Sequence, residues 1–99
     1  MVLRSELRRK VLDVIGGLPE ARSPLNARVT GTIPMDGYRI DKLVFESLPG
    51  IHVTALVYVP EGLRGKKPAV LLACGHSAVG KAYPPYQEIA VRLRWMQRE

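Results

Sequence analysis

The stretch "YRIDKLVFESLPGIHVTALVYVP", residues 38–60, alternates apolar and polar side chains on both sides of a short turn signal. In its second half the apolar residues occupy every other position: Val53, Ala55, Val57 and Val59. Alternation with a period of two is typical of a β-strand with one covered face. The turn signal "LPG", residues 48–50, separates the two runs. The stretch therefore predicts an antiparallel hairpin over residues 38–60.

The first half of this hairpin breaks its pattern once, at Asp41 and Lys42. Its apolar residues are Tyr38, Ile40, Leu43 and Phe45. Because one extra residue in a strand shifts the alternation by one position, this slip indicates a β-bulge.

After the hairpin, "PAVLLAC", residues 68–74, is a continuous apolar run. Such a run is expected of a strand that is covered on both faces inside a parallel sheet. The loop "GHSAVGKAYPP" then leads into residues 84–96, where Tyr86, Ile89 and Leu93 recur at helical spacing. These segments predict a buried strand over residues 68–74 and a helix over residues 84–96.

The segment before the hairpin divides into a helix and a connector. Its first apolar residues recur at helical spacing: Leu3, Leu7, Val11, Val14 and Ile15. They predict an amphipathic helix over residues 1–18, ended by Gly16 and Gly17. Residues 19–37 are rich in proline, glycine and small polar residues and predict a connector that runs extended against another part of the protein. The expected fold class is α/β, with an N-terminal helix, an antiparallel hairpin, one buried strand, a loop and a helix.

The composition indicates one small globular domain rather than a disordered chain. The protein has 99 residues, 46% hydrophobic and 24% charged, which is the balance of a globular domain. Its formal net charge of +6 permits loose attraction to nucleic acid or anionic lipid, although a solvated helix face explains the same residues. Because the basic residues are not interleaved with aromatic ones, we expect no specific nucleic-acid partner.

The sequence predicts no metal site, no intrachain disulfide and no membrane-spanning segment. Cys74 is the single cysteine and allows no intrachain disulfide; with His52 and His76 it makes no metal-ligand cluster. His52 is interpreted as an outward-facing strand residue. No apolar run has the length of a membrane span, and "MVLRSELRRK" lacks the apolar core of a signal peptide. We expect a cytoplasmic protein with no cofactor and no membrane partner.

Three interpretations compete for the loop that follows residue 74. A nucleophile elbow would use Ser77 in a G-x-S-x-G motif, but Val79 stands where the second glycine belongs. An elbow also passes directly from its serine into a helix, whereas two prolines intervene here. No Asp or His follows Ser77 to complete a triad. These departures argue against Ser77 as a nucleophile.

A phosphate-binding loop is the second interpretation, because residues 75–81 spell G-x-x-x-x-G-K. Lys81 has the correct spacing, but Ala82 replaces the hydroxyl residue that would bind Mg²⁺. Pro84 and Pro85 disturb the helix start that should face the phosphate. A nucleotide-binding module is therefore the weaker alternative.

An oxyanion-hole loop is the third interpretation. It needs a strand that ends, a residue that lets the backbone turn, and N–H groups that face a cleft. Gly75 permits the turn, and the backbone N–H of His76 or Ser77 is the candidate donor. A plain strand-to-helix loop fits the same residues, so both remain open at this point.

Four stretches together resemble the N-terminal part of α/β-hydrolases of the acetyl xylan esterase-like group: "RSPLNARVTG", "YRIDKLVFESLPGIHVTALVYVPEG", "KPAVLLACGHSAVGK" and "YQEIAVRL". The resemblance covers residues 22–93 and follows the family's order. It implies an incomplete α/β-hydrolase sheet in which "CGH" is the oxyanion loop. The backbone N–H of His76 would be one oxyanion donor, supported by Gly75 and Ser77. The nucleophile, the acid and the catalytic His would lie outside this chain.

The resemblance also implies an activity. The complete enzyme would be a serine-dependent hydrolase of carboxylic, acetyl-type esters, with a small ester as substrate and no cofactor. After Leu93 the chain reads "RWMQRE" where the family enters its next strand, so we expect a truncated or frame-disrupted product that is inactive alone. With open strand edges, such a fragment is expected to self-associate. The alternatives are a small basic protein that binds nucleic acid or a partner, and the nucleotide-binding module.

Overall fold

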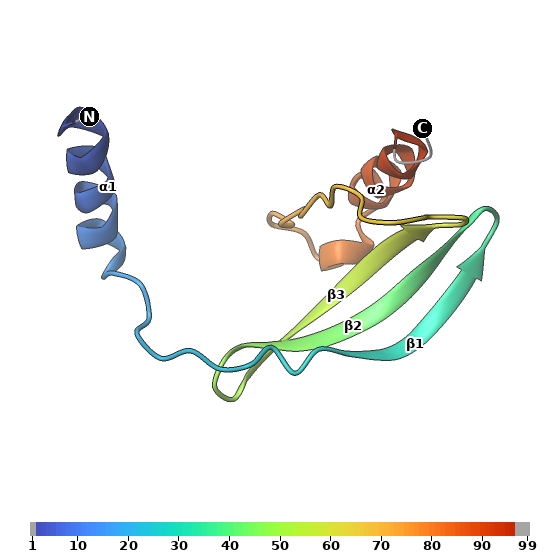
Figure 1. Cartoon of the computed structure of the whole chain (residues 1–99), viewed down its shortest axis with the longest axis horizontal. Coiled ribbons are helices and arrows are strands. Elements are labelled where there is room, and N and C mark those ends of the chain that lie inside the picture. Colours follow the sequence, from blue (N-terminus) through green and yellow to red (C-terminus); the bar gives the residue numbers. More distant parts are fainter. Residues whose placement is uncertain (1, 97–99) are drawn as a thin grey trace.

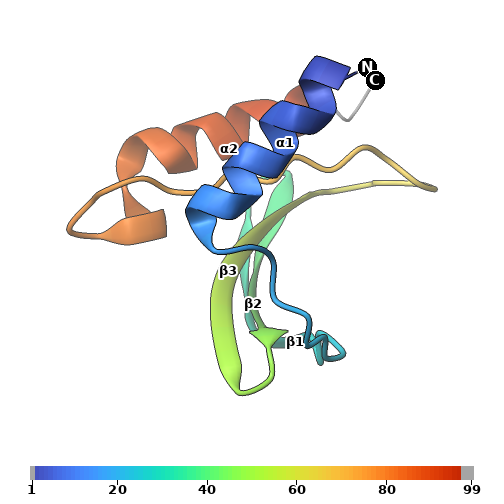
Figure 2. The same cartoon turned by 90° about the vertical axis from the view of Figure 1, so that its left-hand side faces the viewer.

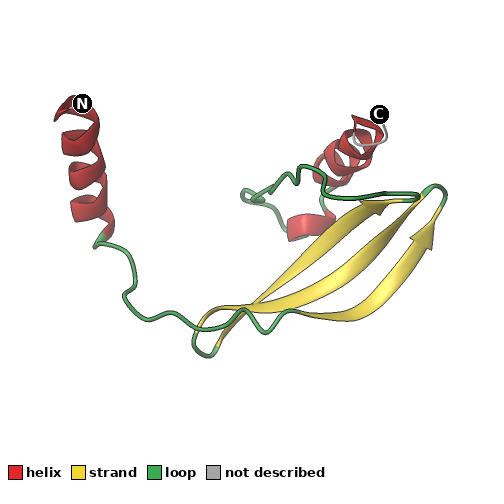
Figure 3. Ribbon diagram, viewed as in Figure 1, coloured by secondary structure: helices red, strands yellow, loops and turns green. Residues whose placement is uncertain are grey.

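The computed structural model describes residues 2–96, and its order of elements is helix, three strands, short helix and helix (Figure 1). The bounds are α1 Val2–Ile15, β1 Arg28–Met35, β2 Tyr38–Leu48, β3 Ile51–Pro60, the 3₁₀ helix η1 Gly80–Ala82 and α2 Pro84–Met96. The three strands form one antiparallel sheet in the order β1-β2-β3 (Figure 3). The described chain is therefore a mixed α/β structure at the coarse level.

The predicted hairpin is present as β2 and β3. Its strands pair in antiparallel register from Tyr38 opposite Pro60 to Leu48 opposite Ile51. Pro49 and Gly50 form the two-residue turn, and Gly50 has a φ of +76°. A positive φ at the second turn residue is a conformation that glycine adopts at little cost.

The prediction that residues 19–37 form a connector is wrong in its second half. Residues 28–35 are strand β1, which pairs with β2 from Arg28 opposite Val44 to Met35 opposite Tyr38. The turn between them is Asp36-Gly37, with Gly37 at a φ of +77°. Asp-Gly is a strong signal for a tight hairpin, so the sequence contained the evidence for this strand.

The bulge predicted at Asp41 and Lys42 of β2 is not at that position. Strand β2 pairs continuously with β3 through Asp41 and Lys42. The register shifts instead between Val29 and Gly31 of β1, and between Glu46 and Leu48 of β2 beside the turn. The slip in the apolar pattern has another cause: because neighbouring residues alternate between faces, Tyr38 and Ile40 face one side of the sheet, whereas Leu43 and Phe45 face the other.

Helix α1 ends at Ile15, three residues before the predicted limit of residue 18, and in Figure 1 it packs on nothing in the rest of the described chain. Gly16 and Gly17 have φ values of +83° and +84°, and the Gly17 N–H bonds to the Leu12 carbonyl at 2.7 Å. This left-handed ending terminates the helix. The radius of gyration is 17.1 Å, against about 13 Å for a compact domain of this length. Figure 1 shows the reason, because residues 16–27 carry α1 away from the sheet, and Figure 2 gives the view in which α1 faces the viewer.

The prediction of a buried strand over residues 68–74 is wrong. The segment has no regular secondary structure and lies outside the sheet. Leu71 is 95% exposed and Val70 is 62% exposed. A strand needs a neighbouring strand to hydrogen-bond with, and burial on both faces needs a layer of structure on each side. Among residues 2–96, no strand pairs with this segment and no two layers enclose it. As a result, no fully enclosed apolar core forms among the residues whose burial is described.

Candidate functional site

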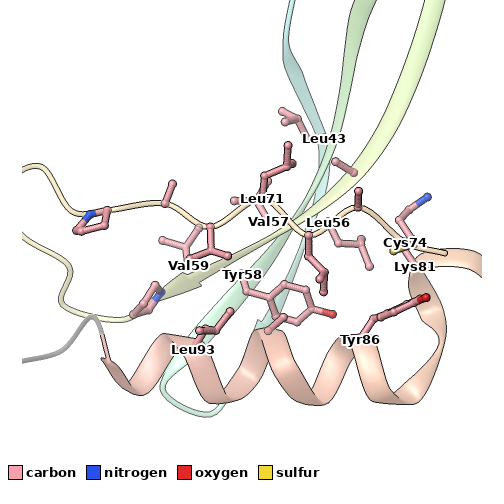
Figure 4. A pocket seen from close by; sticks show the side chains of 18 of the residues that line it. Leu43, Leu56, Val57, Tyr58, Val59, Leu71, Cys74, Lys81, Tyr86 and Leu93 are labelled. Atoms are coloured by element: carbon pink, nitrogen blue, oxygen red, sulfur yellow. The ribbon is translucent and has the colours of Figure 1, made fainter. Parts of the chain in front are cut away.

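An apolar groove of about 940 Å³ separates β3 from residues 68–74, with α2 forming its floor (Figure 4). Leu56, Val57 and Tyr58 line it from β3, and Leu93 lines it from α2. Cys74, Lys81 and Tyr86 gather at one end of the groove in Figure 4. That end is therefore where polar groups meet the apolar walls.

In the described chain, no further strand pairs with the outer side of β3 or with residues 69–74, which form the two long sides of this groove. β3 is an edge strand of the sheet, so its side away from β2 faces the groove rather than another strand. Residues 68–74 form the opposite side and belong to no sheet. Unpaired strand edges present N–H and C=O groups that can accept an added strand.

The loop at the polar end is anchored to helix α2 through Gly75. The Gly75 N–H donates a hydrogen bond to the Tyr86 hydroxyl oxygen at 2.8 Å. The start of α2 holds Tyr86 in position. The Tyr86 N–H donates to the Tyr83 carbonyl at 3.0 Å, and the two rings meet edge-on with their centres 5.3 Å apart. The position of the loop therefore depends on the first turn of this helix.

Ser77 is used within the loop. Its hydroxyl oxygen accepts a hydrogen bond from the Val79 N–H at 3.2 Å, and its carbonyl accepts one from the Gly80 N–H at 3.4 Å. Gly80 has a φ of +55°, a left-handed conformation that suits glycine. In the described chain no histidine is hydrogen-bonded to the Ser77 hydroxyl, so Ser77 lacks the adjacent base that activates a serine.

His76 lies between these two anchored residues and is exposed. Within residues 2–96, no hydrogen bond engages its backbone N–H. Gly75 on one side donates to Tyr86, and Ser77 on the other side closes the turn. The loop therefore offers an unpaired backbone donor held between two fixed points.

Lys81 turns back toward the sheet. Its ammonium group donates to the Thr54 hydroxyl of β3 at 2.7 Å. Lys81 itself lies in the single turn η1, and α2 begins only at Pro84. A phosphate loop needs its lysine and a helix N-terminus aimed at the same anion, and this arrangement directs the lysine to β3 instead.

Tyr58 is the described group with a clearly perturbed acidity. Partial burial raises the pKa of its hydroxyl above the usual 10.0, and nearby Tyr38 and Cys74 raise the pKa further because a second negative charge is disfavoured. Its ring stacks on Tyr38 with the ring centres 6.2 Å apart. The raised pKa shows that the folded protein favours the neutral hydroxyl of Tyr58 at the groove wall.

The remaining sequence candidates do not form a metal or nucleophile site. His52 lies 3.6 Å from the Glu46 carboxylate on the hairpin, away from the loop. Cys74 is exposed and unpaired by any disulfide. Among residues 2–96, no three His, Cys, Asp or Glu side chains lie close enough to hold a metal ion, and no helix is long and apolar enough to cross a membrane.

The sequence missed Tyr86 and Thr54 as parts of this site. The helical spacing predicts Tyr86 only as a residue of an apolar helix face, and no pattern singles out Thr54. Their partners, Gly75 and Lys81, lie 11 and 27 residues away along the chain. No local sequence pattern indicates such distant pairs. The one available signal is that the hydroxyl of a tyrosine in the first helical turn after a glycine loop needs a hydrogen-bond partner.

Comparison with known protein families, characterised proteins and solved structures found no match to this chain. The chemistry of the site is therefore argued from its own residues. Its two distinctive features are the free N–H of His76 and the apolar groove that ends beside it.

Proposed function

We propose that this chain is the N-terminal segment of a serine-dependent α/β-hydrolase that acts on carboxylic, acetyl-type esters. In the complete enzyme the backbone N–H of His76 would help to bind the oxyanion that forms when a serine attacks the ester carbonyl. Gly75 and Ser77 would hold that donor in place. The resemblance of residues 22–93 to the acetyl xylan esterase-like group motivates the proposal, and the loop geometry supports it.

The single observation that carries the proposal is the contrast between Gly75 and His76. The Gly75 N–H is satisfied by Tyr86, whereas the next N–H along the loop has no partner. A useful oxyanion donor must be fixed before the reaction, so that no reorganisation is needed when charge develops. The Tyr86 anchor and the Ser77 turn supply this fixing from both sides of His76.

The groove beside the loop gives a second line of support. The resemblance implies a further strand between the hairpin and residues 68–74. The groove lies between those two parts, and both of its long sides lack strand partners. An apolar strand placed there would pair with β3 and would cover side chains such as Leu71, which is now 95% exposed.

The residues of this chain do not by themselves supply acyl transfer. Ser77 accepts a hydrogen bond from the Val79 N–H and has no histidine base in the described chain. His76 would contribute its backbone, not its ring. The expected role is therefore to bind and orient the oxyanion, while the nucleophile comes from other residues of the complete enzyme.

Self-association is the interaction that we propose for the chain in isolation. The open edges of β3 and residues 68–74 can accept a strand from another copy. The apolar side chains along this side, Val70, Leu71 and Leu72, have little cover. Association through this side would bury them in the absence of the expected strand.

The experiment begins with the DNA that follows the codon for Glu99, which should encode a G-x-S-x-G motif in one frame. The polypeptide it encodes is co-expressed with this chain and assayed with an activated acetate ester. His76→Pro removes the backbone N–H, whereas His76→Ala keeps it. We expect His76→Pro to lower kcat about 100-fold or more, since that is the usual cost of one oxyanion donor.

His76→Ala is the matched control and should keep most of the activity. An equal loss of activity in both variants would show that the imidazole ring of His76, and not its backbone N–H, is needed. Full activity in His76→Pro, with the complex still assembled, would contradict the oxyanion proposal.

A further inference from the structure

Helix α1 carries an apolar stripe that nothing covers. The stripe consists of Leu3, Leu7, Val11 and Val14, which recur at spacings of four, four and three residues and so share one side of the helix. Their exposed fractions are 67%, 54%, 58% and 86%. Figure 1 shows α1 standing clear of the sheet and of α2, so the stripe is free of the rest of the described chain.

Basic side chains border this stripe. At about 100° per residue, Arg4 lies beside Val11 on one border and Lys10 lies beside Leu3 on the other. Arg8 lies next to Arg4, farther from the stripe. Among the described residues, none of these three basic side chains takes part in an ion pair.

The opposite side of the helix has a different character. Arg9 lies there and is 3.9 Å from Asp13, so its charge is partly balanced within the helix. Glu6 lies one helical turn before Lys10 and about as far from the centre of the stripe as Arg8, on the other side of the helix. The positive charge that borders the stripe is therefore concentrated on the side of Arg4 and Arg8.

We propose that α1 binds the surface of an anionic lipid bilayer, with its stripe in the outer hydrocarbon and its bordering basic groups on the lipid phosphates. Long Arg and Lys side chains can bury their methylene groups and still reach the headgroups. This is the arrangement of helices that lie in the membrane interface. The proposal concerns the surface only and replaces the expectation of no membrane partner.

The chemistry favours a bilayer over the other partners that a basic helix can bind. A nucleic-acid backbone would satisfy Arg4, Arg8 and Lys10 but would leave the stripe in water. A second copy of this chain would cover the stripe but would bring equal positive charges together. Only an anionic apolar surface offers both kinds of contact.

The test is flotation of the full chain with vesicles of phosphatidylcholine, with and without phosphatidylglycerol. We expect binding to the mixed vesicles, little binding to phosphatidylcholine alone, and release by added salt. Leu7→Gln, at the centre of the stripe, should abolish flotation. Circular dichroism of each variant reports whether the sheet and helices persist.

Arg4→Gln and Arg9→Gln form a matched pair because both remove one positive charge from the same helix. Arg4→Gln should lower the partition coefficient about fivefold, the effect of one basic residue near an anionic surface. Arg9→Gln should change it less than Arg4→Gln. A loss of helix structure would produce the opposite ranking of the two variants. Arg9→Gln removes the Arg9–Asp13 pair and so weakens the helix, whereas Arg4→Gln removes a cation near the helix N-terminus, where positive charge is unfavourable.

Four results would overturn the proposal. They are absence of flotation, equal binding to both vesicle types, equal effects of Arg4→Gln and Arg9→Gln, and a dimer that Leu7→Gln dissociates without any lipid. Binding of duplex DNA in place of vesicles would assign α1 to nucleic acid. None of these results bears on the ester-hydrolase proposal, which rests on other residues.

Discussion

The Tyr86 hydroxyl accepts a hydrogen bond from the Gly75 N–H at 2.8 Å and thereby ties the loop after residue 74 to helix α2. The contact is also close sterically, since a Cβ atom at residue 75 would lie 3.0 Å from the Tyr86 oxygen. Glycine at this position is therefore explained by the approach of Tyr86. This pair determines which N–H of the loop stays available.

Tyr86→Phe should release the Gly75 N–H while keeping the ring. We expect the exchange of that amide with solvent to accelerate about fivefold, because a bond of about 1 kcal/mol is lost. Hydrogen exchange followed by NMR measures it. The Val79 amide, which bonds to Ser77, serves as the internal control and should not change. Unchanged exchange at Gly75 would show that the bond does not hold the loop.

Gly75→Ala should destabilise the protein by about 1 kcal/mol, since the new methyl group forces the Tyr86 side chain to move. The same substitution made in the Tyr86→Phe background should cost less, because the hydroxyl that it meets is gone. Urea unfolding of the four variants gives the coupling energy. Additive effects would mean that the methyl group meets something other than the Tyr86 hydroxyl.

Lys81 should have no role in binding nucleotide, because its ammonium group bonds to Thr54. We expect ATP with Mg²⁺ to leave the melting temperature unchanged, and Lys81→Ala to lower it slightly through loss of the Thr54 contact. Thr54→Val is the control and should lower the melting temperature to a similar extent. A nucleotide-dependent rise that disappears only in Lys81→Ala would support a phosphate loop.

Stability should fall at alkaline pH through Tyr58. Its pKa is raised in the folded protein, so the folded state favours the neutral hydroxyl. A group with a raised pKa stabilises the fold below its unfolded value of 10.0 and loses that contribution as pH rises through the folded value. Unfolding free energies measured on both sides of pH 10.0 should decline less steeply in Tyr58→Phe. An identical decline in both proteins would show that Tyr58 does not cause it.

Leu71→Lys should reduce self-association, because Leu71 is 95% exposed beside the open groove. A lysine on an open edge opposes pairing with another chain. Sedimentation at several concentrations should show smaller species than for the parent chain. Val14→Lys is the matched control, since Val14 is 86% exposed on α1 and the added charge is the same. Equal improvement by both would indicate a general effect of charge.

Local signals in the sequence determined the hairpin and the helix ends. Alternation in residues 38–60 and the Pro49-Gly50 turn were enough to predict β2 and β3, because strand faces and tight turns are set by neighbouring residues. Gly16 and Gly17 ended α1 for the same reason. Asp36-Gly37 carried an equally local signal for β1, which the abundance of proline and small residues around it obscured.

Only the tertiary structure decided the state of residues 68–74 and the composition of the site. The apolar run "PAVLLAC" predicts a buried strand, yet a strand forms only where neighbours supply hydrogen bonds and cover, and the described chain supplies neither. The pairing of Gly75 with Tyr86 and of Lys81 with Thr54 joins residues that no periodicity relates. Local patterns report the conformation of a segment, whereas the partner of a donor depends on how distant segments meet in space.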